Sequence, residues 1–92
     1  MRMSINVEIS PMFARYTGNQ ANLKAEGKTV GECLQDLGRR YPELKKIMLD
    51  QDGNLFQSFD VFVNGESAYP GPMARPVKDG DRLHVVMLIQ GG

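Results

Sequence analysis

The sequence predicts an α+β domain in which one main helix, with a short second helix, crosses a mixed sheet of about four or five strands. Three observations lead to this fold class. The 92 residues suit one compact domain. Several short segments alternate apolar and polar residues, as half-buried strands do. Between them lies one longer stretch with apolar residues at helical spacing, preceded by a helix-capping pattern.

The first two predicted strands lie at the start of the chain. Residues 3–9 alternate strictly, which predicts a strand with one exposed face. Pro11 ends this strand because proline cannot donate a ladder hydrogen bond. Residues 17–20, Thr-Gly-Asn-Gln, are typical of a turn. A weaker alternation over 21–25 then predicts a second strand, which pairs antiparallel with the first.

The main helix is predicted by its cap and its apolar stripe. Thr29 and Glu32 have the spacing of a capping box, a hydroxyl followed three residues later by a carboxylate. Pro42 disfavours helical geometry at Tyr41, so the helix is expected to end there. A short second helix is expected over 43–49. The stripe of the main helix consists of Val30, Cys33, Leu34, Leu37 and Tyr41, and Leu44, Ile47 and Met48 should point inward from the second.

The remaining strands follow the helices. Residues 59–63 predict a strand, and Asn64-Gly65 is a strong hairpin signal that leads to a short return strand over 66–69. After a turn at 77–81, the last strand is expected over 82–89. Its side chains divide between two faces, with Leu83, Val85 and Met87 on one and His84, Val86 and Leu88 on the other.

This element order, with the first and last strands central and parallel, is that of the ubiquitin-like β-grasp, one of several α+β arrangements. We expect residues 1–89 to form the β-grasp domain and residues 90–92 to be a flexible C-terminal Gly-Gly tail.

Composition excludes several classes of function. Eleven Lys and Arg balance eleven Asp and Glu, so the formal net charge of zero does not favour nucleic-acid binding. The single cysteine, Cys33, can form neither an internal disulfide nor a four-cysteine iron–sulfur site. No apolar run approaches the ~20 residues that span a bilayer. We therefore expect a cytoplasmic protein without nucleic-acid or membrane partners.

The sequence contains no evident catalytic set. His84 is the only histidine and is expected on the exposed face of the last strand. Cys33 occupies an apolar helix position, where a free cysteine acts as a small hydrophobic residue. The acidic pairs at 50/52 and 79/81 flank glycines, as in ordinary turns. We therefore expect no metal site and no enzymatic activity of its own, but a carrier, a binding module or a subunit.

The end of the sequence is the remaining chemical candidate. Gly91 and Gly92 follow a long apolar strand that would direct them away from the body of the domain. Two glycines allow the backbone to enter a channel too narrow for a Cβ atom and leave the final carboxylate unhindered. Ordering the tail costs roughly 1–2 kcal/mol per residue, which a partner's channel must offset. The tail thus suits a carboxylate that is presented to another enzyme.

Three segments carry a resemblance to a known family. They are residues 13–18 (Phe-Ala-Arg-Tyr-Thr-Gly), residues 61–65 (Val-Phe-Val-Asn-Gly), and residues 77–81 (Val-Lys-Asp-Gly-Asp) followed by a strand and Gly91-Gly92. On these segments the chain resembles the MoaD/ThiS-like sulfur carriers, which include the small subunit of molybdopterin synthase and the thiamin-pathway carrier. Residues 15–18 and 53–55 resemble the cysteine-biosynthesis branch most. The chain differs from molybdopterin-type and cysteine-type carriers in having Met-Leu-Ile-Gln at 87–90, where they place a proline.

The resemblance implies a mechanism that depends on partners. An activating enzyme would adenylate the Gly92 carboxylate with ATP, and a sulfide or persulfide would convert it to a thiocarboxylate. A sulfur-accepting synthase would then use that sulfur in cysteine, molybdopterin or thiamin biosynthesis. No cofactor would be bound by the carrier itself.

Two further hypotheses complete the sequence-based account. Phe62, Val86 and Leu88 are expected on the outer face of neighbouring strands, where an exposed apolar cluster would form the partner interface unless the chain covers it. The function itself has two alternatives. The chain could be a ubiquitin-like modifier joined to lysines through Gly92, or a non-reactive β-grasp binding module.

Overall fold

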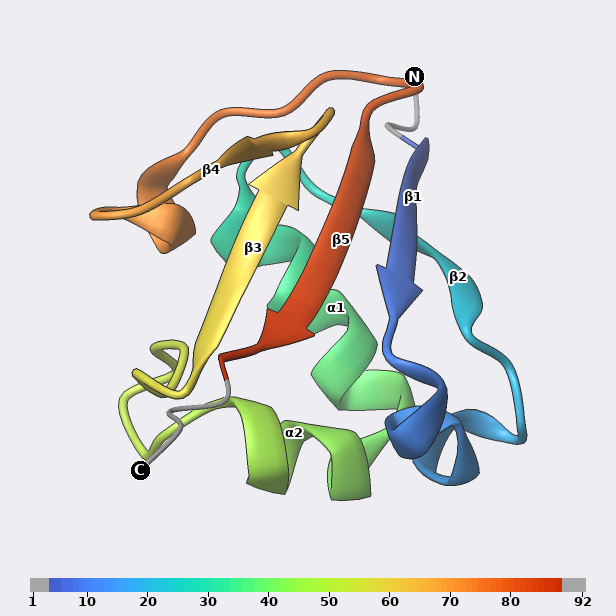
Figure 1. The fold of residues 1–92 in the computed structure, drawn as a ribbon. Helices are drawn as coiled ribbons and strands as arrows, with labels where there is room; N and C mark the ends of the chain where they lie inside the picture. The colour runs from blue at the N-terminus through green and yellow to red at the C-terminus, as the bar shows by residue number, and fades with distance from the viewer. Residues whose placement is uncertain (1–3, 89–92) are drawn as a thin grey trace.

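A computed structural model describes residues 4–88 (Figure 1). Its strands are β1 (Ser4–Ile9), β2 (Asn22–Glu26), β3 (Phe59–Val63), β4 (Glu66–Ser67) and β5 (Arg82–Met87). Its α-helices are α1 (Val30–Arg40) and α2 (Pro42–Met48), and two 3-10 helices are η1 (Pro11–Thr17) and η2 (Pro72–Ala74). None of the helices within residues 4–88 is long and apolar enough to cross a membrane.

The five strands form one mixed sheet in the order β2-β1-β5-β3-β4. β1 and β5 pair in parallel, while β1–β2, β3–β5 and β3–β4 are antiparallel. In Figure 1, α1 crosses behind the sheet and α2 follows at its lower edge. This arrangement confirms the ubiquitin-like β-grasp, including the parallel pairing of the first and last strands.

The core lies between α1 and one face of the sheet. The cross-strand register places Val7 opposite both Leu23 and Leu83, so the apolar residues of three strands form one layer. Burial of these side chains supplies most of the driving force for folding. The core contains Ile5, Val7, Ile9, Leu23, Ala25, Val61, Val63, Leu83 and Val85 from the sheet, and Val30, Cys33, Leu34, Leu37, Leu44 and Met48 from the helices.

The predicted cap of the main helix is present. The Thr29 hydroxyl accepts a hydrogen bond from the Glu32 backbone N–H at 3.1 Å. The Glu32 carboxylate accepts one from the Lys28 N–H at 3.0 Å, one residue before the cap itself. The Glu32 N–H is one of the donors that the start of an α-helix leaves without an intrahelical partner. The helix ends at Arg40, and α2 begins two residues later. Its first residue is Pro42, and proline is well suited to a first helical turn.

The structure differs from the sequence-based expectation at several element ends and in one added helix. The return strand predicted over 66–69 is wrong beyond Ser67, since the chain turns into Pro70, which has no N–H to donate. β5 ends at Met87, and residue 89 lies outside the described residues. Met87 shares a face with Leu83 and Val85, as expected, since it pairs with Phe59, but it is exposed because it lies at the strand end. η1 was not predicted; Phe13 on it contacts Phe59, with 5.6 Å between ring centroids.

Candidate functional site

The Gly91-Gly92 tail lies outside the described residues, so the structure shows only the strand that leads to it. β5 is the middle strand of the sheet and is hydrogen-bonded on both sides, to β1 and to β3. Beyond its end, the Leu88 N–H donates to the Ser58 carbonyl at 2.6 Å. Leu88 is 46% exposed. The last described residue is therefore held at the surface by a strand that the sheet fixes in place.

The three residues expected at the partner interface lie at or beside the outer sheet face. Phe62 on β3 pairs with His84 on β5, and Asp60 pairs with Val86, so Phe62 and Val86 are diagonal neighbours. Both are half-buried, whereas Leu88, past the end of β5, is exposed. The sheet thus brings Phe62 and Val86 together on the face opposite α1. Their role in binding a partner stays a prediction.

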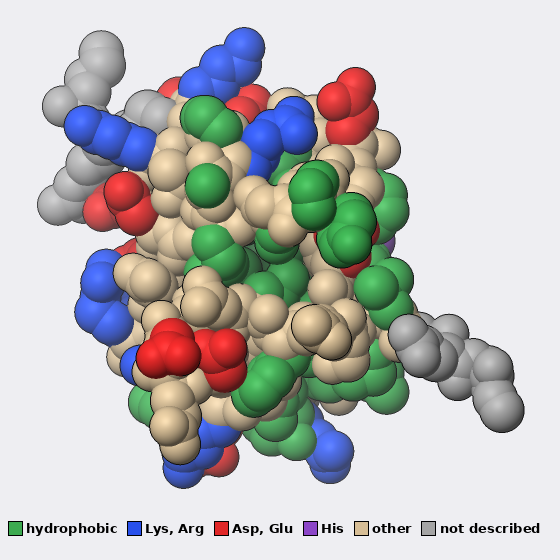
Figure 2. All heavy atoms as spheres, turned by 90° about the vertical axis from the view of Figure 1, so that its left-hand side faces the viewer, with side chains coloured by type: hydrophobic (Ala, Val, Ile, Leu, Met, Phe, Trp, Pro, Cys, Tyr) green, Lys and Arg blue, Asp and Glu red, His purple; other side chains and the backbone are tan. Residues whose placement is uncertain are grey.

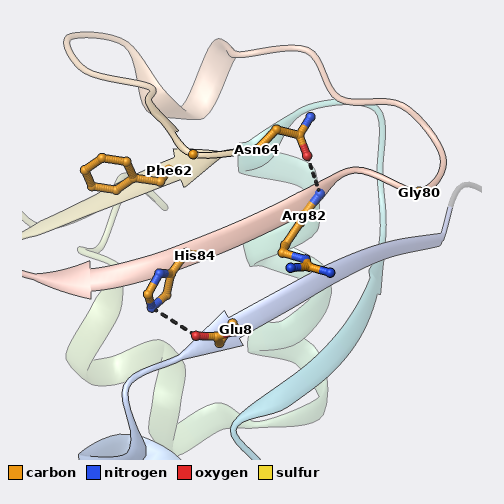
Figure 3. A pocket seen from close by; sticks show the side chains of 7 residues that line it. Glu8, Phe62, Asn64, Gly80, Arg82 and His84 are labelled. Carbon is orange, nitrogen blue, oxygen red and sulfur yellow. Dashed lines mark hydrogen bonds and ion pairs between the residues drawn. The ribbon is translucent and has the colours of Figure 1, made fainter.

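A polar, open cleft of about 550 Å³ adjoins Phe62 on the outer face (Figure 3). The Glu8 carboxylate on β1 lies 3.4 Å from His84 Nε2 on β5. Arg82 projects from β5 toward β1 in the same view. His84 is therefore on the exposed face as predicted, beside a carboxylate. The cleft is too open to exclude water from a reaction, which agrees with a binding surface better than with an active site.

The acidic pairs have structural roles, as predicted. Asp79 accepts a hydrogen bond from the Ser4 N–H at 2.8 Å. Asp81 is buried and accepts one from the Lys78 N–H at 2.9 Å and one from Asn64 Nδ2 at 3.1 Å. These bonds, the Lys78 N–H first and Asn64 second, lower the pKa of the Asp81 carboxyl. Asn64 Oδ1 in turn accepts from the Arg82 N–H at 3.0 Å, so Asp81 and Asn64 join the β3–β4 turn to the start of β5.

The other predicted turn and the cysteine also agree with expectation. Asp50 Oδ1 accepts hydrogen bonds from the N–H groups of Asp52 and Asn54 at 2.9 and 3.0 Å. Across residues 4–88, no three His, Cys, Asp or Glu side chains gather where they could hold a metal ion.

Cys33 is buried within the core. Its burial, and to a smaller extent the nearby carboxylates of Asp36 and Glu32, raise the pKa of its thiol to about 11. The thiol therefore stays protonated near neutral pH, where it is a poor nucleophile.

One feature was missed by the sequence analysis. Asp60 lies in the middle of the otherwise apolar β3 and is only 9% exposed. It lines a second hollow, of about 750 Å³, together with side chains from the loop before β3 and the segment after β4. A charged residue inside an apolar strand was the available signal. The hollow itself could not be foreseen because its walls come from segments distant in sequence.

Comparison with known proteins identifies what this architecture is similar to. The model of the ThiS family matches residues 12–92. A chain of the Amycolatopsis orientalis BexX/CysO complex is 29% identical, with a TM-score of 0.84 over 96% of this chain and 99% of that one. CysO of Mycobacterium tuberculosis is 26% identical, with a TM-score of 0.82 over 92% and 99% of the two chains. SAMP1 of Haloferax volcanii is 25% identical, with a TM-score of 0.80 over 97% and 99%.

A weaker likeness links the chain to a much larger enzyme. Over 75 residues, the chain is 29% identical to the mitochondrial medium-chain acyl-CoA ligase ACSF2 of Danio rerio. That match covers 82% of this chain but only 12% of the ligase. The likeness is therefore to a short segment of the ligase and carries no ligase activity to this chain.

Proposed function

Because the chain belongs to the ThiS family, a family of small sulfur-carrier proteins, we propose that it carries sulfur as a thiocarboxylate on Gly92. One observation carries the proposal most directly. The family match runs from residue 12 through residue 92 and so includes Gly91 and Gly92. The proposal requires Gly92 to have a free carboxylate, the only group of the tail that can be activated.

The proposed chemistry takes two steps, both in a partner's active site. A Gly92 carboxylate oxygen attacks the α-phosphate of ATP, which releases pyrophosphate and leaves an acyl adenylate. A sulfide sulfur then attacks the carbonyl carbon, and AMP leaves because it is a better leaving group than an oxide. If a persulfide attacks instead, it forms an acyl disulfide, and a thiol of the partner cleaves the S–S bond, forming a disulfide and releasing the thiocarboxylate. The product is a thiocarboxylate that a sulfur-accepting synthase can use. ATP binding and proton transfer belong to the partners.

The carrier contributes placement and recognition. β5, held by two neighbouring strands and by the Asp81–Asn64 contacts at its start, gives the tail a fixed point of departure. Phe62 and Val86 on the outer face, with Leu88 beside the exit, are the proposed contact for the activating enzyme. A chain similar to this one occurs in a complex with a second protein, BexX. The receiving pathway is of the cysteine, molybdopterin or thiamin type.

A second candidate function is conjugation to proteins. The chain is similar to SAMP1 of Haloferax volcanii, which a related structure calls small archaeal modifier protein 1. In that case a lysine amine attacks the same adenylate, forms an amide bond and releases AMP. Gly92 linked to lysines of other proteins in a lysate of the source cells would favour this function over sulfur transfer.

A variant with one residue appended after Gly92 tests both functions against a non-reactive module. The addition removes the glycine carboxylate from the reactive position and leaves the domain of residues 4–88 untouched. We expect a cognate activating enzyme with ATP to form an adenylate on the natural chain and not on the extended one. If the extended chain supports the cellular function equally well, the tail is inert and the chain is a binding module.

A further inference from the structure

A large hollow lies beside β3, at the edge of the sheet that β4 leaves open. It measures about 750 Å³ and lies between residues 55–57, before β3, and residues 67–72, which begin at the last residue of β4. Two of its aromatic side chains are well exposed, Phe56 at 40% and Tyr69 at 78%. Leu88, at the exit of β5, lines the same groove. Figure 2 faces this side of the molecule and shows hydrophobic side chains gathered across it.

Asp60 is the one charged side chain among the described residues that line the groove. Its Oδ1 accepts a hydrogen bond from the Val61 N–H at 2.8 Å, and its Oδ2 accepts one from the Ser67 hydroxyl at 2.7 Å. Each oxygen has two lone pairs, so one on each remains free. Within residues 4–88, no lysine, arginine or histidine pairs with this carboxylate. A largely buried carboxylate without a cation is costly for a fold to keep.

The fold by itself does not need the negative charge of Asp60. β4 is so short that it pairs only with Phe62 and Val63, and the Val61 N–H at the open edge therefore needs another acceptor. An asparagine would supply that acceptor through Oδ1 and could donate from Nδ2 to the Ser67 oxygen. The two structural hydrogen bonds explain a polar residue at position 60 but leave its charge unexplained.

We propose that this groove binds an arginine side chain of a protein partner. A guanidinium is planar, so it can donate two parallel hydrogen bonds to the two free lone pairs of the Asp60 carboxylate. It also stacks on aromatic rings, which Phe56 and Tyr69 supply at the groove wall. A lysine ammonium fits less well, because it is a compact, strongly hydrated charge without the fork geometry.

This inference goes beyond the sulfur-carrier function and does not depend on it. No step of tail chemistry uses Asp60, and the groove lies among residues that the structure describes. Leu88 nevertheless puts the groove next to the point where the chain leaves β5. A partner that receives the tail could therefore contact the groove at the same time.

The test is a two-dimensional NMR titration of the ¹⁵N-labelled chain with acetyl-arginine amide. We expect amide shifts concentrated at residues 55–61 and 67–69, with acetyl-lysine amide binding more weakly. The neutral isostere acetyl-citrulline amide should cause almost no shift. Asp60→Asn, which can keep the Val61 bond through Oδ1 and reverse the Ser67 bond by donating from Nδ2, should weaken arginine binding about tenfold, as loss of a charge-assisted hydrogen bond would.

Two further variants make the test decisive. Asp52→Asn removes the same charge from an exposed loop and should leave arginine binding unchanged. Tyr69→Ala changes a side chain too exposed to be needed for folding and should weaken binding by about threefold, the effect of losing one exposed cation–π contact. The proposal is overturned if citrulline binds as well as arginine, or if Asp60→Asn and the natural chain bind equally. Shifts of the groove amides with protein concentration alone would instead assign the groove to a second copy of this chain.

Discussion

Replacing Asp81 by asparagine should loosen the start of the strand that leads to the tail. The Asp81 carboxylate accepts from the Lys78 N–H and from Asn64 Nδ2, one bond on each oxygen. Asparagine has only one acceptor oxygen, so one of these two donors must lose its partner. Asn64 cannot turn its amide around to compensate, because its own Oδ1 already accepts from the Arg82 N–H.

The expected cost follows from these contacts. Asn64 and Lys78 are exposed and both bonds are only partly buried, so water can reach the donor that loses its partner, and the cost is about 1 kcal/mol, the usual net worth of a hydrogen bond. For a domain of this size, each kcal/mol lowers the melting temperature by roughly 4–8 °C. We therefore expect Asp81→Asn to melt about 4–8 °C below the natural chain at pH 7, for a cost of about 1 kcal/mol.

The pH dependence gives the prediction a direction. Because the pKa of Asp81 is lowered in the folded state, its stabilisation is fully present above the unfolded value of about 3.9. It is lost as the pH falls through the lower, folded pKa. The difference in unfolding free energy between the two chains, measured by urea titration, should therefore shrink on acidification. Equal stability at pH 7, or a gap that persists undiminished in strong acid, would refute this reasoning.

Three more predictions concern the interface, the thiol and the tail. Phe62→Ala should weaken binding to the activating enzyme by about 1–3 kcal/mol, as loss of an apolar anchor does, whereas Asn22→Ala on the same face should not. If calorimetry finds that the Phe62→Ala variant binds as tightly as the natural chain, Phe62 is not part of the interface. Cys33 should react with a thiol reagent at pH 8 only after denaturation, because the folded thiol is buried and its pKa is raised to about 11; a fast reaction of the folded chain would contradict its burial. Gly92→Ala should leave the melting temperature unchanged and slow adenylation, since the methyl group crowds a narrow channel; full activity would count against the tail mechanism.

The register of the sheet changes how the interface should be probed. Val86→Asp is an obvious variant from the sequence, but Val86 lies directly opposite Asp60 across the β3–β5 pair. Like charges opposite one another destabilise a sheet, so this variant would confuse lost binding with lost stability. Phe62→Ala avoids the problem because it adds no charge.

Much of the fold could be predicted from the sequence because the deciding signals are local. Alternation over 3–9 and 59–63 marks strands with one buried face, and Thr29 with Glu32 marks the helix start through hydrogen bonds between neighbours. The glycine and asparagine turns were equally local. Asn64 and Gly65 both adopt positive φ angles, which a tight hairpin turn requires.

What escaped prediction depends on contacts between distant segments. η1 packs through the contact of Phe13 with Phe59, residues that only the folded sheet brings together. The short β4 and the exposure of Met87 follow from where neighbouring strands end. The Asp60 groove is made by two loops and the end of β5. The role of the tail glycines, by contrast, stays a prediction from sequence alone, because their chemical value is their lack of side chains.

The central claim is that Gly92 carries sulfur, and the mass of the intact protein tests it most directly. The chain would be incubated with a cognate activating enzyme, ATP and a sulfur source, with a reaction lacking ATP as the control. The account predicts a species heavier by the difference between a sulfur and an oxygen atom, located by fragmentation at Gly92 and absent without ATP. An unmodified chain beside an activating enzyme that converts another carrier in the same mixture would contradict it.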